Sequence, residues 1–455
     1  MSAYEKHIQN VDKHRQLILD AERYLWKNPE PGYKEWKTQK YLAEQFEKLG
    51  YKLTFAGDIP GFYTDLDTGR PGPTVLLMAE MDSLIVASHP ECDKETGAVH
   101  ACGHHTQCAG LLGAAAALKE PGALDGLCGK IRLMAVPAEE LIEVEWREQL
   151  RKEGTIRYFG GKQEFIARGY MDGIDFNMLI HSSTQREHRY MNTHKGQNGC
   201  VIKSVTFTGR SSHAGSAPHN GINALYAANT AMSAINALRE TFKDGDMTRV
   251  HPIITQGGTV VNAVPETVKM EAYVRGASTK AILRENTKVN RAIAASALAL
   301  GANAIFGDRP GYMPCKNTPE AIPLSVEAMA AVVGEENVEY RDVWGAGSTD
   351  MGDMTTLFPT AYMHAGGVAG KPHGNTYHVT DADAACVDPA KVLCVLTHML
   401  LENDAAKLWE IKQNFTPVFE NTEAYCAAMD SLIMDGPAVT YHEDGTATVW
   451  YENVR

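Results

Sequence analysis

The sequence predicts an α/β protein with a mostly parallel central sheet, helices on both faces of that sheet, and an inserted open-faced α+β sandwich. One observation is a set of short, nearly continuous apolar runs that alternate with helical segments, as a parallel sheet covered on both faces requires. These runs lie at residues 51–55, 74–79, 130–136 and 176–180. The second observation is a change near Gly196, after which residues 201–208 alternate between apolar and polar, as in a strand with one exposed face.

The helices of the first part follow from hydrophobic period and from breaking residues. Residues 17–25 keep a helical period until the segment Asn28-Pro29-Glu30-Pro31-Gly32 interrupts it. A second helix is predicted over about 35–49, and an Ala/Leu-rich helix over about 107–119.

The elements after residue 198 predict a compact inserted domain and then a return to α/β character. The inserted part is predicted to contain strands at 201–208, 250–255 and 268–274 and helices at about 220–240 and 279–299. The predicted elements beyond it are a helix over 322–334, a strand over 361–364 and a helix over 388–404. We therefore expect residues 1–197 and 311–455 to form one discontinuous domain, and residues 198–310 to form the inserted domain.

The composition excludes several classes of protein. The 455 residues include 43 basic and 56 acidic side chains, a formal charge of −13, which argues against nucleic acid or anionic lipid as a partner. No run approaches the roughly 18 apolar residues of a membrane span, and the polar first residues differ from a signal peptide. Nine cysteines without a framework predict reduced thiols and a cytoplasmic location.

The segment His100-Ala101-Cys102-Gly103-His104 is the clearest indication of chemistry. It lies between the strand at 74–79 and the Ala/Leu-rich helix, and open α/β sheets bind ligands at the carboxyl ends of their strands. Gly103 lets the backbone bend, so that the thiolate of Cys102 and the imidazole of His104 can reach one ion. Sulfur beside nitrogen suits Zn²⁺ or another late divalent ion. Taken alone, such a pattern more often marks a buried cysteine near an ordinary histidine.

Further candidate ligands lie at strand ends and in loops. Glu139 and Glu140 follow the strand at 130–136, and adjacent carboxylates are costly to bury unless a cation or a proton neutralises one. His181 ends the next strand, and His378 precedes the last long helix. If each is considered alone, the simplest interpretation of Glu139 and Glu140 is a solvated acidic turn. The simplest interpretation of His181 and His378 is histidines without a metal. Together the predicted ligands are Cys102, His104, Glu140, His181 and His378. Five ligands with one bridging atom suit a pair of divalent ions, whereas a structural zinc takes four.

Two polar loops of the inserted domain are candidates for substrate contact. The glycine-rich loop 209–215 follows a strand and can bring His213 to a ligand. The turn around Asn262 offers an amide that can hydrogen-bond a substrate. Without a ligand, both are ordinary surface loops.

Together these segments resemble, in order along nearly the whole chain, the metallo-aminoacylase and carboxypeptidase family, and within it the aminobenzoyl-glutamate hydrolase and auxin-conjugate amidohydrolase branch. The motifs that carry the resemblance are Asn28-Pro29-Glu30, Ala79-Glu80-Met81-Asp82, HACGH at 100–104, PAEE at 137–140, His181, GRSSHAGSAPHNGINAL at 209–225, GTVVNAVPETV at 258–268 and GSTDMGD at 347–353. Any one motif is a modest match, but the ordered set is specific.

The resemblance implies a metal centre and its chemistry. The positions that match the family's metal ligands are Cys102, His104, Glu140, His181 and His378. They imply one or two divalent ions, zinc or manganese, with Cys102 as the bridge. Glu139 matches the general base, and Asp82 matches the acidic position that orients a ligand from behind.

The resemblance also implies roles for the inserted domain. His213 and Asn262 match positions that reach the substrate, His213 often in the site of the partner protomer. Arg275 is a candidate for binding a substrate carboxylate. The resemblance further implies a homodimer formed through residues 198–310.

Three departures from the family pattern stand out. His105 follows CGH where the branch often has Asp or Asn, and Glu80 stands at the usual His or Asp position of the first motif. Glu140 and His181 are 41 positions apart, which is more than the family's short connection. We expect the extra segment, residues 141–180, to reshape the pocket and the substrate range.

The predicted function is hydrolysis of the amide bond of an N-acyl amino acid, an aminobenzoyl-glutamate-like conjugate or a small dipeptide. Metal-bound water ionises near pH 7. Glu139 takes the proton and passes it to the leaving amine, while the metals and His213 stabilise the oxyanion.

Two alternatives to this function stay open at the level of sequence. One makes Cys102 a nucleophile with His104 or His105 as its base, although residues so close in sequence rarely reach that geometry. The other is a binding protein that keeps the fold without turnover.

Overall fold

The computed structural model describes residues 3–186 and 188–452, and the chain divides into two compact units. The first unit comprises Met1–Gly196, Lys316–Val343 and Asp353–Thr422. The second comprises Gln197–Cys315, Trp344–Gly352 and Glu423–Arg455. The C-terminal segment Glu423–Arg455 therefore belongs to the second unit, whereas the sequence predicted that it belongs to the larger domain. The reason is that strand β19 (Met434–Pro437) pairs with β13 (Asn303–Pro310), a contact between distant residues that local sequence does not signal.

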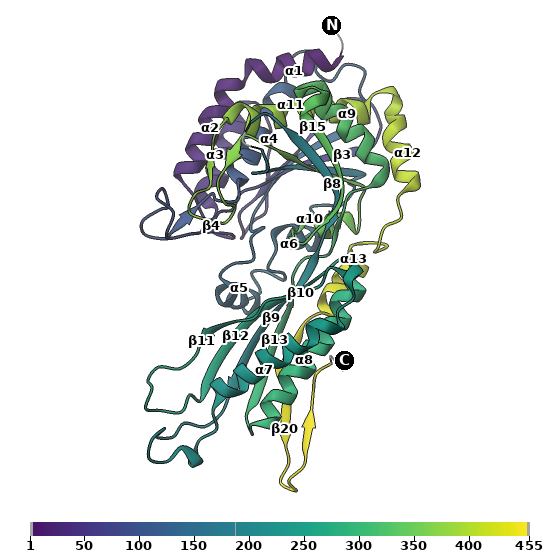
Figure 1. The fold of residues 1–455 in the computed structure, drawn as a ribbon. Coiled ribbons are helices and arrows are strands. Elements are labelled where there is room, and N and C mark those ends of the chain that lie inside the picture. Colours follow the sequence, from purple (N-terminus) through teal and green to yellow (C-terminus); the bar gives the residue numbers. More distant parts are fainter. Residues whose placement is uncertain (1–2, 187, 453–455) are drawn as a thin grey trace. The chain divides into compact units, whose positions relative to one another are not determined.

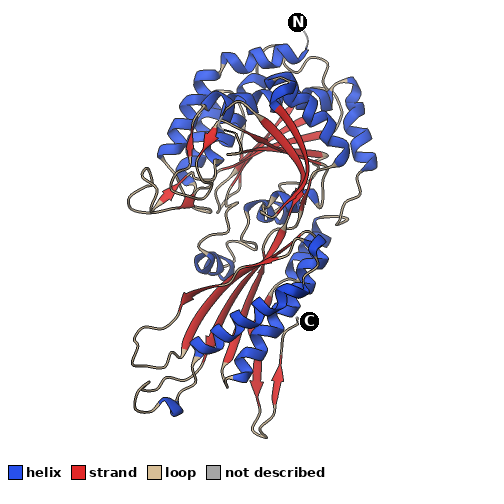
Figure 2. Ribbon diagram, viewed as in Figure 1, coloured by secondary structure: helices blue, strands red, loops and turns tan. Residues whose placement is uncertain are grey.

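A mixed sheet forms the centre of the first unit (Figure 2). Its strand order is β1 (Thr54–Phe55), β2 (Phe62–Asp67), β6 (Lys130–Val136), β3 (Thr74–Glu80), β7 (Phe176–Ser182), β16 (Thr360–Ala365), β8 (Met191–Gln197) and β14 (Cys315–Lys316), and β15 (Val338–Gly345) also pairs with β8. The four central strands, β6, β3, β7 and β16, are parallel, and β2 and β8 join them antiparallel. The α/β class is confirmed, with antiparallel strands at the flanks of the parallel centre.

Helices surround this sheet. The helices of the first unit are α1 (Ala3–Lys13), α2 (Arg15–Lys27), α3 (Trp36–Lys48), α4 (His104–Leu118), α5 (Val144–Lys152), α6 (Gly161–Ala167), α9 (Ile322–Val333), α11 (Asp388–Leu401) and α12 (Ala406–Asn414). The division between the units falls within the short α10 (Met351–Thr355). Every residue of α4 is buried, and this helix packs against β3 and β7. The N-terminus of α4 therefore lies where the site residues gather.

The second unit is an open-faced sandwich. Its sheet has the order β10 (Arg249–Val250), β12 (Thr267–Gly276), β9 (Gly199–Thr208), β13 and β19, and β11 (Ile253–Gln256) also pairs with β12. Helices α7 (Ala224–Leu238) and α8 (Thr279–Ala299) lie together along one face of the sheet (Figure 1), and α13 (Thr422–Asp430) precedes β19. Buried and partly exposed residues alternate along the whole of β12. In β9, where the sequence predicted alternation over 201–208, residues 199–203 are all buried and the alternation begins at Ser204.

Three two-stranded hairpins complete the strands of the described residues. They are β4 (Leu84–Ile85) with β5 (Ala98–Val99), β17 (Val368–Ala369) with β18 (His378–Val379), and β20 (Val439–Tyr441) with β21 (Ala447–Val449). The hairpin of β17 and β18 carries two histidines that matter below.

Among the described residues, one helical stretch is long and apolar enough to cross a membrane. This stretch is Asp383–Leu401, in which a π-helical turn continues into α11. Its length and its composition are those of a membrane-spanning helix. Its apolar window is entirely buried, and α11 packs against α4 and α9. Core packing in the first unit therefore accounts for its apolar character.

Buried histidines predict that the fold loses stability in acid. Burial lowers the pKa of His7, which lies 3.0 Å from His398, to about 4. Because the unfolded chain takes up a proton near pH 6.5 that the folded chain does not, the free energy of unfolding rises between about pH 4 and pH 6.5. A His7→Gln variant, which cannot titrate, should reduce this rise by up to about 3 kcal/mol. Urea unfolding of the metal-free protein across this range checks it, and identical pH profiles of wild type and variant would contradict it.

Candidate metal centre and substrate-binding residues

The carboxyl ends of neighbouring parallel strands bring the candidate ligands together in the first unit. Glu80 ends β3, and Asp82 follows two residues later on the same side of the extended chain. Glu139 and Glu140 follow β6, and His181 lies near the end of β7. Because parallel strands end at one edge of the sheet, residues far apart in sequence meet there.

The turn before α4 needs a glycine at position 103. Gly103 has a φ of +93°, and a side chain there would collide with Ser182 and Tyr377. The hydroxyl of Ser182 donates a hydrogen bond to the carbonyl of Cys102 (2.9 Å), and the hydroxyl of Tyr377 donates to Ser182 Oγ (3.0 Å). This network fixes the turn that carries Cys102 and His104.

Asp82 orients His104 and the segment that carries Glu140. His104 Nδ1 lies 3.0 Å from both Asp82 Oδ1 and the Asp82 carbonyl oxygen, and both atoms only accept. Nδ1 therefore carries the proton of the neutral ring, and Nε2 is left for a metal ion. The other oxygen of Asp82 accepts the backbone N–H of Glu140 at 2.8 Å. Burial favours a high pKa for Asp82, but His104 and the Glu140 amide outweigh it and lower that pKa.

Two groups of possible ligands share Cys102. One contains Cys102, His104 and His181, the other Cys102, Glu140 and His373, and in each group one ligand atom of every residue lies within 4.8 Å of the others. Cys102 Sγ lies 3.3 Å from His181 Nε2. Glu140 Oε1 lies 3.2 Å from His373 Nε2. A thiolate shared between two ligand groups is the arrangement that a bridged pair of ions requires.

The donor set fits divalent metal ions. His104 Nε2 and Glu140 Oε1 are buried and make no hydrogen bond to any described residue. Such atoms are costly unless they are satisfied, and an ion would satisfy both. Burial, together with the charge of Glu140, raises the pKa of the Cys102 thiol well above its usual value. A bound ion would reverse this effect, because a coordinating thiol is deprotonated.

The structure differs from the sequence prediction for His378. This residue is exposed in β18, and its Nδ1 lies 2.8 Å from the Thr376 carbonyl oxygen. The preceding residue, Tyr377, is turned inward onto Ser182, and successive side chains of extended backbone point to opposite sides. His378 therefore faces away from the buried side.

His373 takes the place predicted for His378. It lies five positions earlier, in the loop between β17 and β18. Its backbone N–H donates to the Ala101 carbonyl at 3.0 Å, next to Cys102, and its φ of +57° is unusual for a residue other than glycine. Unusual backbone angles of this kind cluster at functional sites. Spacing along the sequence could not separate two histidines in one loop.

His105 does not join the ligand groups found among the described residues. Its Nε2 lies 3.4 Å from the carboxylate of Glu22 on α2, and its ring packs against Trp26, with 5.0 Å between the ring centroids. His105 therefore ties α4 to α2. This geometry removes it as a base for Cys102.

Glu80 is held in place beside His104. Lys162 Nζ lies 2.5 Å from Glu80 Oε1, and Gln107 donates to Oε2 at 2.7 Å. Burial would raise the pKa of Glu80, but the positive charges of Lys162 and His104 lower it to about 2. The carboxylate is therefore ionised although it is buried.

His213 and Asn262 lie next to each other in the second unit. His213 forms an antiparallel bridge with Ala263, and the N–H of Ala214 donates to the Asn262 carbonyl at 2.9 Å. His213 Nδ1 accepts the backbone N–H groups of Gly215 and Ser216, each at 3.1 Å. A neutral His213 therefore carries its proton on Nε2, the atom left to donate to a ligand.

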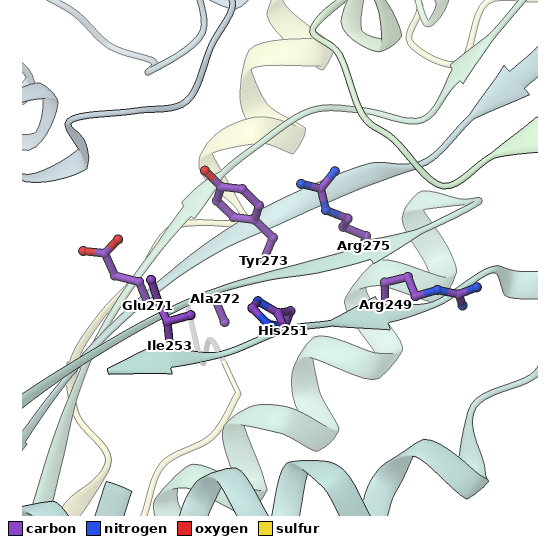
Figure 3. A pocket seen from close by; sticks show the side chains of 7 residues that line it. All are labelled: Arg249, His251, Ile253, Glu271, Ala272, Tyr273 and Arg275. Atoms are coloured by element: carbon purple, nitrogen blue, oxygen red, sulfur yellow. The ribbon is translucent and has the colours of Figure 1, made fainter. Parts of the chain in front are cut away.

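Arg275 lines a cavity of about 320 Å³ on the open face of the second unit's sheet (Figure 3). Glu271, Tyr273 and Arg275 extend from the same side of β12, and Arg275 Nη1 donates to Ser348 Oγ at 2.8 Å. Arg249 stands directly opposite Arg275 in the sheet. Like charges in such a cross-strand pair destabilise a sheet, so an anion bound here would be favourable.

Comparison with known proteins agrees with this fold and with the class of metal-dependent hydrolases. Residues 192–299 match the model of a peptidase dimerisation domain. Thermostable carboxypeptidase 2 of Saccharolobus solfataricus is 31% identical over 282 residues, which cover 60% of this chain and 67% of that protein. The chain belongs to the M20 family of metal-dependent peptidases and amidohydrolases.

Two further relatives extend the comparison. The indole-3-acetyl-aspartic acid hydrolase of Enterobacter agglomerans is 28% identical over 408 residues, with 77% of this chain and 87% of that protein covered. The crystal structure of a dinuclear metal-binding M20 peptidase from Bacillus subtilis has a TM-score of 0.64 at 19% identity and covers 86% of this chain and 99% of its own. At this identity the second likeness concerns the fold. The predicted family and enzyme class are confirmed.

Proposed function

We propose that this protein hydrolyses the amide bond of an N-acyl amino acid, an aminobenzoyl-glutamate-like conjugate or a small dipeptide, using two divalent metal ions. The observation that carries the proposal is the pair of ligand groups that share Cys102. The proposed ligands are Cys102, His104, Glu140, His181 and His373. Zinc suits the thiolate and the imidazoles, and manganese is the other candidate.

Glu139 is proposed as the residue that moves the proton. Bound divalent ions would supply Lewis acidity and a water molecule of lowered pKa. Glu139 is buried, and one of its carboxylate oxygens lies 3.9 Å from His104 Nε2. From that position its carboxylate would take the proton of the water and then deliver it to the leaving amine. Asp82 keeps His104 in the tautomer that leaves Nε2 free.

Residues of the second unit are proposed to recognise the substrate. The Nε2–H of His213 would donate to the developing oxyanion, and Asn262 would donate from its amide. Arg275 would pair with a carboxylate of the substrate. This pairing favours amides whose amino-acid part keeps a free carboxylate over amides that have no carboxylate. The extra segment 141–180 would narrow the range of acyl groups.

The proposal includes assembly and location. The match to a dimerisation domain supports a homodimer formed through the second unit. All nine cysteines are free and buried, which supports a reducing compartment such as the cytoplasm.

Metal removal tests the proposed function. Dialysis against a chelator should abolish hydrolysis of a panel of N-acyl amino acids, aminobenzoyl-glutamate and dipeptides, and Zn²⁺ or Mn²⁺ should restore it. Metal analysis of the active protein should find two ions per chain. A metal-free protein that hydrolyses the panel at the original rate would point instead to Cys102 as a nucleophile. A metal-loaded protein that cleaves no member of the panel would point to a binding function.

A further inference from the structure

The turn that leads to Glu139 has an unusual backbone conformation. Ala138, the residue before Glu139, has a φ of +57°. This left-handed region is unfavourable for any residue with a Cβ atom, because that atom crowds a backbone carbonyl oxygen. Such a conformation persists only where the surrounding structure holds it. The groups that hold Ala138 therefore also determine where Glu139 points.

Two buried carboxylates hold the backbone amides on either side of Glu139. Glu35 Oε1 accepts the N–H of Ala138 at 2.7 Å. Asp82 Oδ2 accepts the N–H of Glu140 at 2.8 Å. The side chains of Glu35 and Asp82 are both fully buried. Because each amide belongs to a direct neighbour of Glu139, the two hydrogen bonds fix the backbone that carries this residue.

The extra segment holds the other polar group of Ala138. The N–H of Gly161, at the start of α6, donates to the carbonyl oxygen of Ala138 at 3.0 Å. A side chain at position 161 would collide with the carbonyl of Pro137, so the two segments are in close contact. The N–H and the carbonyl of Ala138 are therefore bonded to two residues that lie far apart in the chain, Glu35 and Gly161.

The burial of Glu35 is unfavourable for stability alone. Its second carboxyl oxygen, Oε2, is buried and makes no hydrogen bond to any described residue. A buried polar atom of this kind destabilises a fold, and an apolar side chain would avoid the cost. Such a group in a native structure requires an explanation, and a role in catalysis is one. The hydrogen bond of Glu35 to the residue before Glu139 supplies that explanation.

We propose that Glu35 is a positioning residue, which accepts the N–H of Ala138 and thereby aims the carboxylate of Glu139. Gly161 of the extra segment completes this support from the other side of Ala138. Glu35 is absent from the ligand groups found among the described residues, so its loss should leave the metal ions bound. This inference rests on the proposed function, because it requires Glu139 to move the proton.

Kinetics of the metal-loaded protein test the proposal. Glu35→Leu, which cannot accept a hydrogen bond, should lower kcat for an N-acyl amino acid by about 10- to 100-fold, because a misplacement of about 1 Å can cost 100-fold. KM should stay within about twofold, and metal analysis should still find two ions per chain. Glu35→Gln, whose amide oxygen can accept the N–H of Ala138, should restore kcat to within about threefold of wild type.

A double variant separates positioning from a general loss of structure. In a Glu139→Gln background the proton acceptor is already absent. Adding Glu35→Leu to this background should therefore lower the residual rate by less than about threefold, because Glu35 acts through Glu139.

Asp175→Leu is the matched control. Asp175 Oδ2 also accepts a backbone N–H, that of Thr74 at 2.8 Å. Thr74 begins β3, so this contact lies at the opposite end of the strand from Glu80. The control loses a comparable hydrogen bond in the same unit but should keep kcat within about threefold of wild type. Circular dichroism verifies that each variant is folded.

A second variant covers the case in which Glu35→Leu does not fold. Glu35→Asp keeps the carboxylate but withdraws it from Ala138 by one methylene group, so it should lower kcat in the same direction. A folded variant that keeps two ions and the wild-type kcat would overturn the inference. An equal loss of rate with and without Glu139 would also overturn it, as would loss of metal. A wild-type protein that hydrolyses no member of the substrate panel would contradict the proposed function itself, so the two failures can be told apart.

Discussion

Glu139→Gln is expected to lower kcat/KM for an N-acyl amino acid by about 10³-fold or more while two metal ions stay bound. The amide has nearly the shape of the carboxylate but cannot accept a proton, and positioned proton transfer typically contributes 10²- to 10⁴-fold. Glu140, the carboxylate in the ligand group with Cys102 and His373, is unchanged in this variant. Steady-state kinetics and metal analysis of the same preparation measure both quantities.

The control for this prediction is Glu153→Gln. Glu153 is an exposed glutamate that follows α5 in the extra segment, so its loss changes the net charge equally but should leave kcat/KM within about twofold. Near-normal turnover by Glu139→Gln would remove Glu139 from its role as the base. A loss of metal together with activity would instead make Glu139 a ligand.

His373→Ala is expected to lower the metal content by about one ion per chain and to lower kcat/KM by at least about 100-fold. The reason is that His373 lies 3.2 Å from Glu140 and shares a ligand group with Cys102. Loss of a residue that merely supports a ligand already costs about 10- to 100-fold in metal affinity or activity. Metal analysis after dialysis against a fixed Zn²⁺ concentration, with kinetics on the same sample, measures the effect.

His378→Ala provides the matched comparison, because the same change is made five residues away in the same hairpin. His378 is exposed, so its removal should leave metal content and kcat/KM within about twofold of wild type. The opposite outcome, loss of metal in His378→Ala and retention in His373→Ala, would restore the assignment made from sequence.

The parts of the fold that depend on local pattern follow the sequence closely. The strand predicted at 130–136 is β6, and the helix predicted at 279–299 is α8 with the same bounds. A near-continuous apolar run and a long helical period are properties of neighbouring residues, so they are visible without the partner elements. Strands β13 and β19 are among those that local pattern does not predict. β13 pairs with β9 and with β19, which lie far from it in the chain.

The site shows the same division between local and distant information. The turn that carries Cys102 and His104 predicts both as ligands, and the structure brings them near His181 and Glu140. The sequence predicted His378 as the last ligand, whereas the structure places His373 there. The inward turn of Tyr377 onto Ser182 directs the next residue, His378, away from the site, and local sequence does not show this turn. The contact of Lys162 with Glu80 leaves no signal in the sequence, because it joins residues 82 positions apart.

The amino-acid order by itself determined the α/β class, the inserted sandwich, and the kinds of donor atoms available, since these follow from hydrophobic period and side-chain chemistry. Tertiary structure alone decided which histidine meets Glu140 and that a lysine from the extra segment lies against Glu80. The physical reason is that a metal site is defined by distances of a few ångströms between atoms, and those distances are set by how strands, turns and helices pack rather than by spacing along the chain.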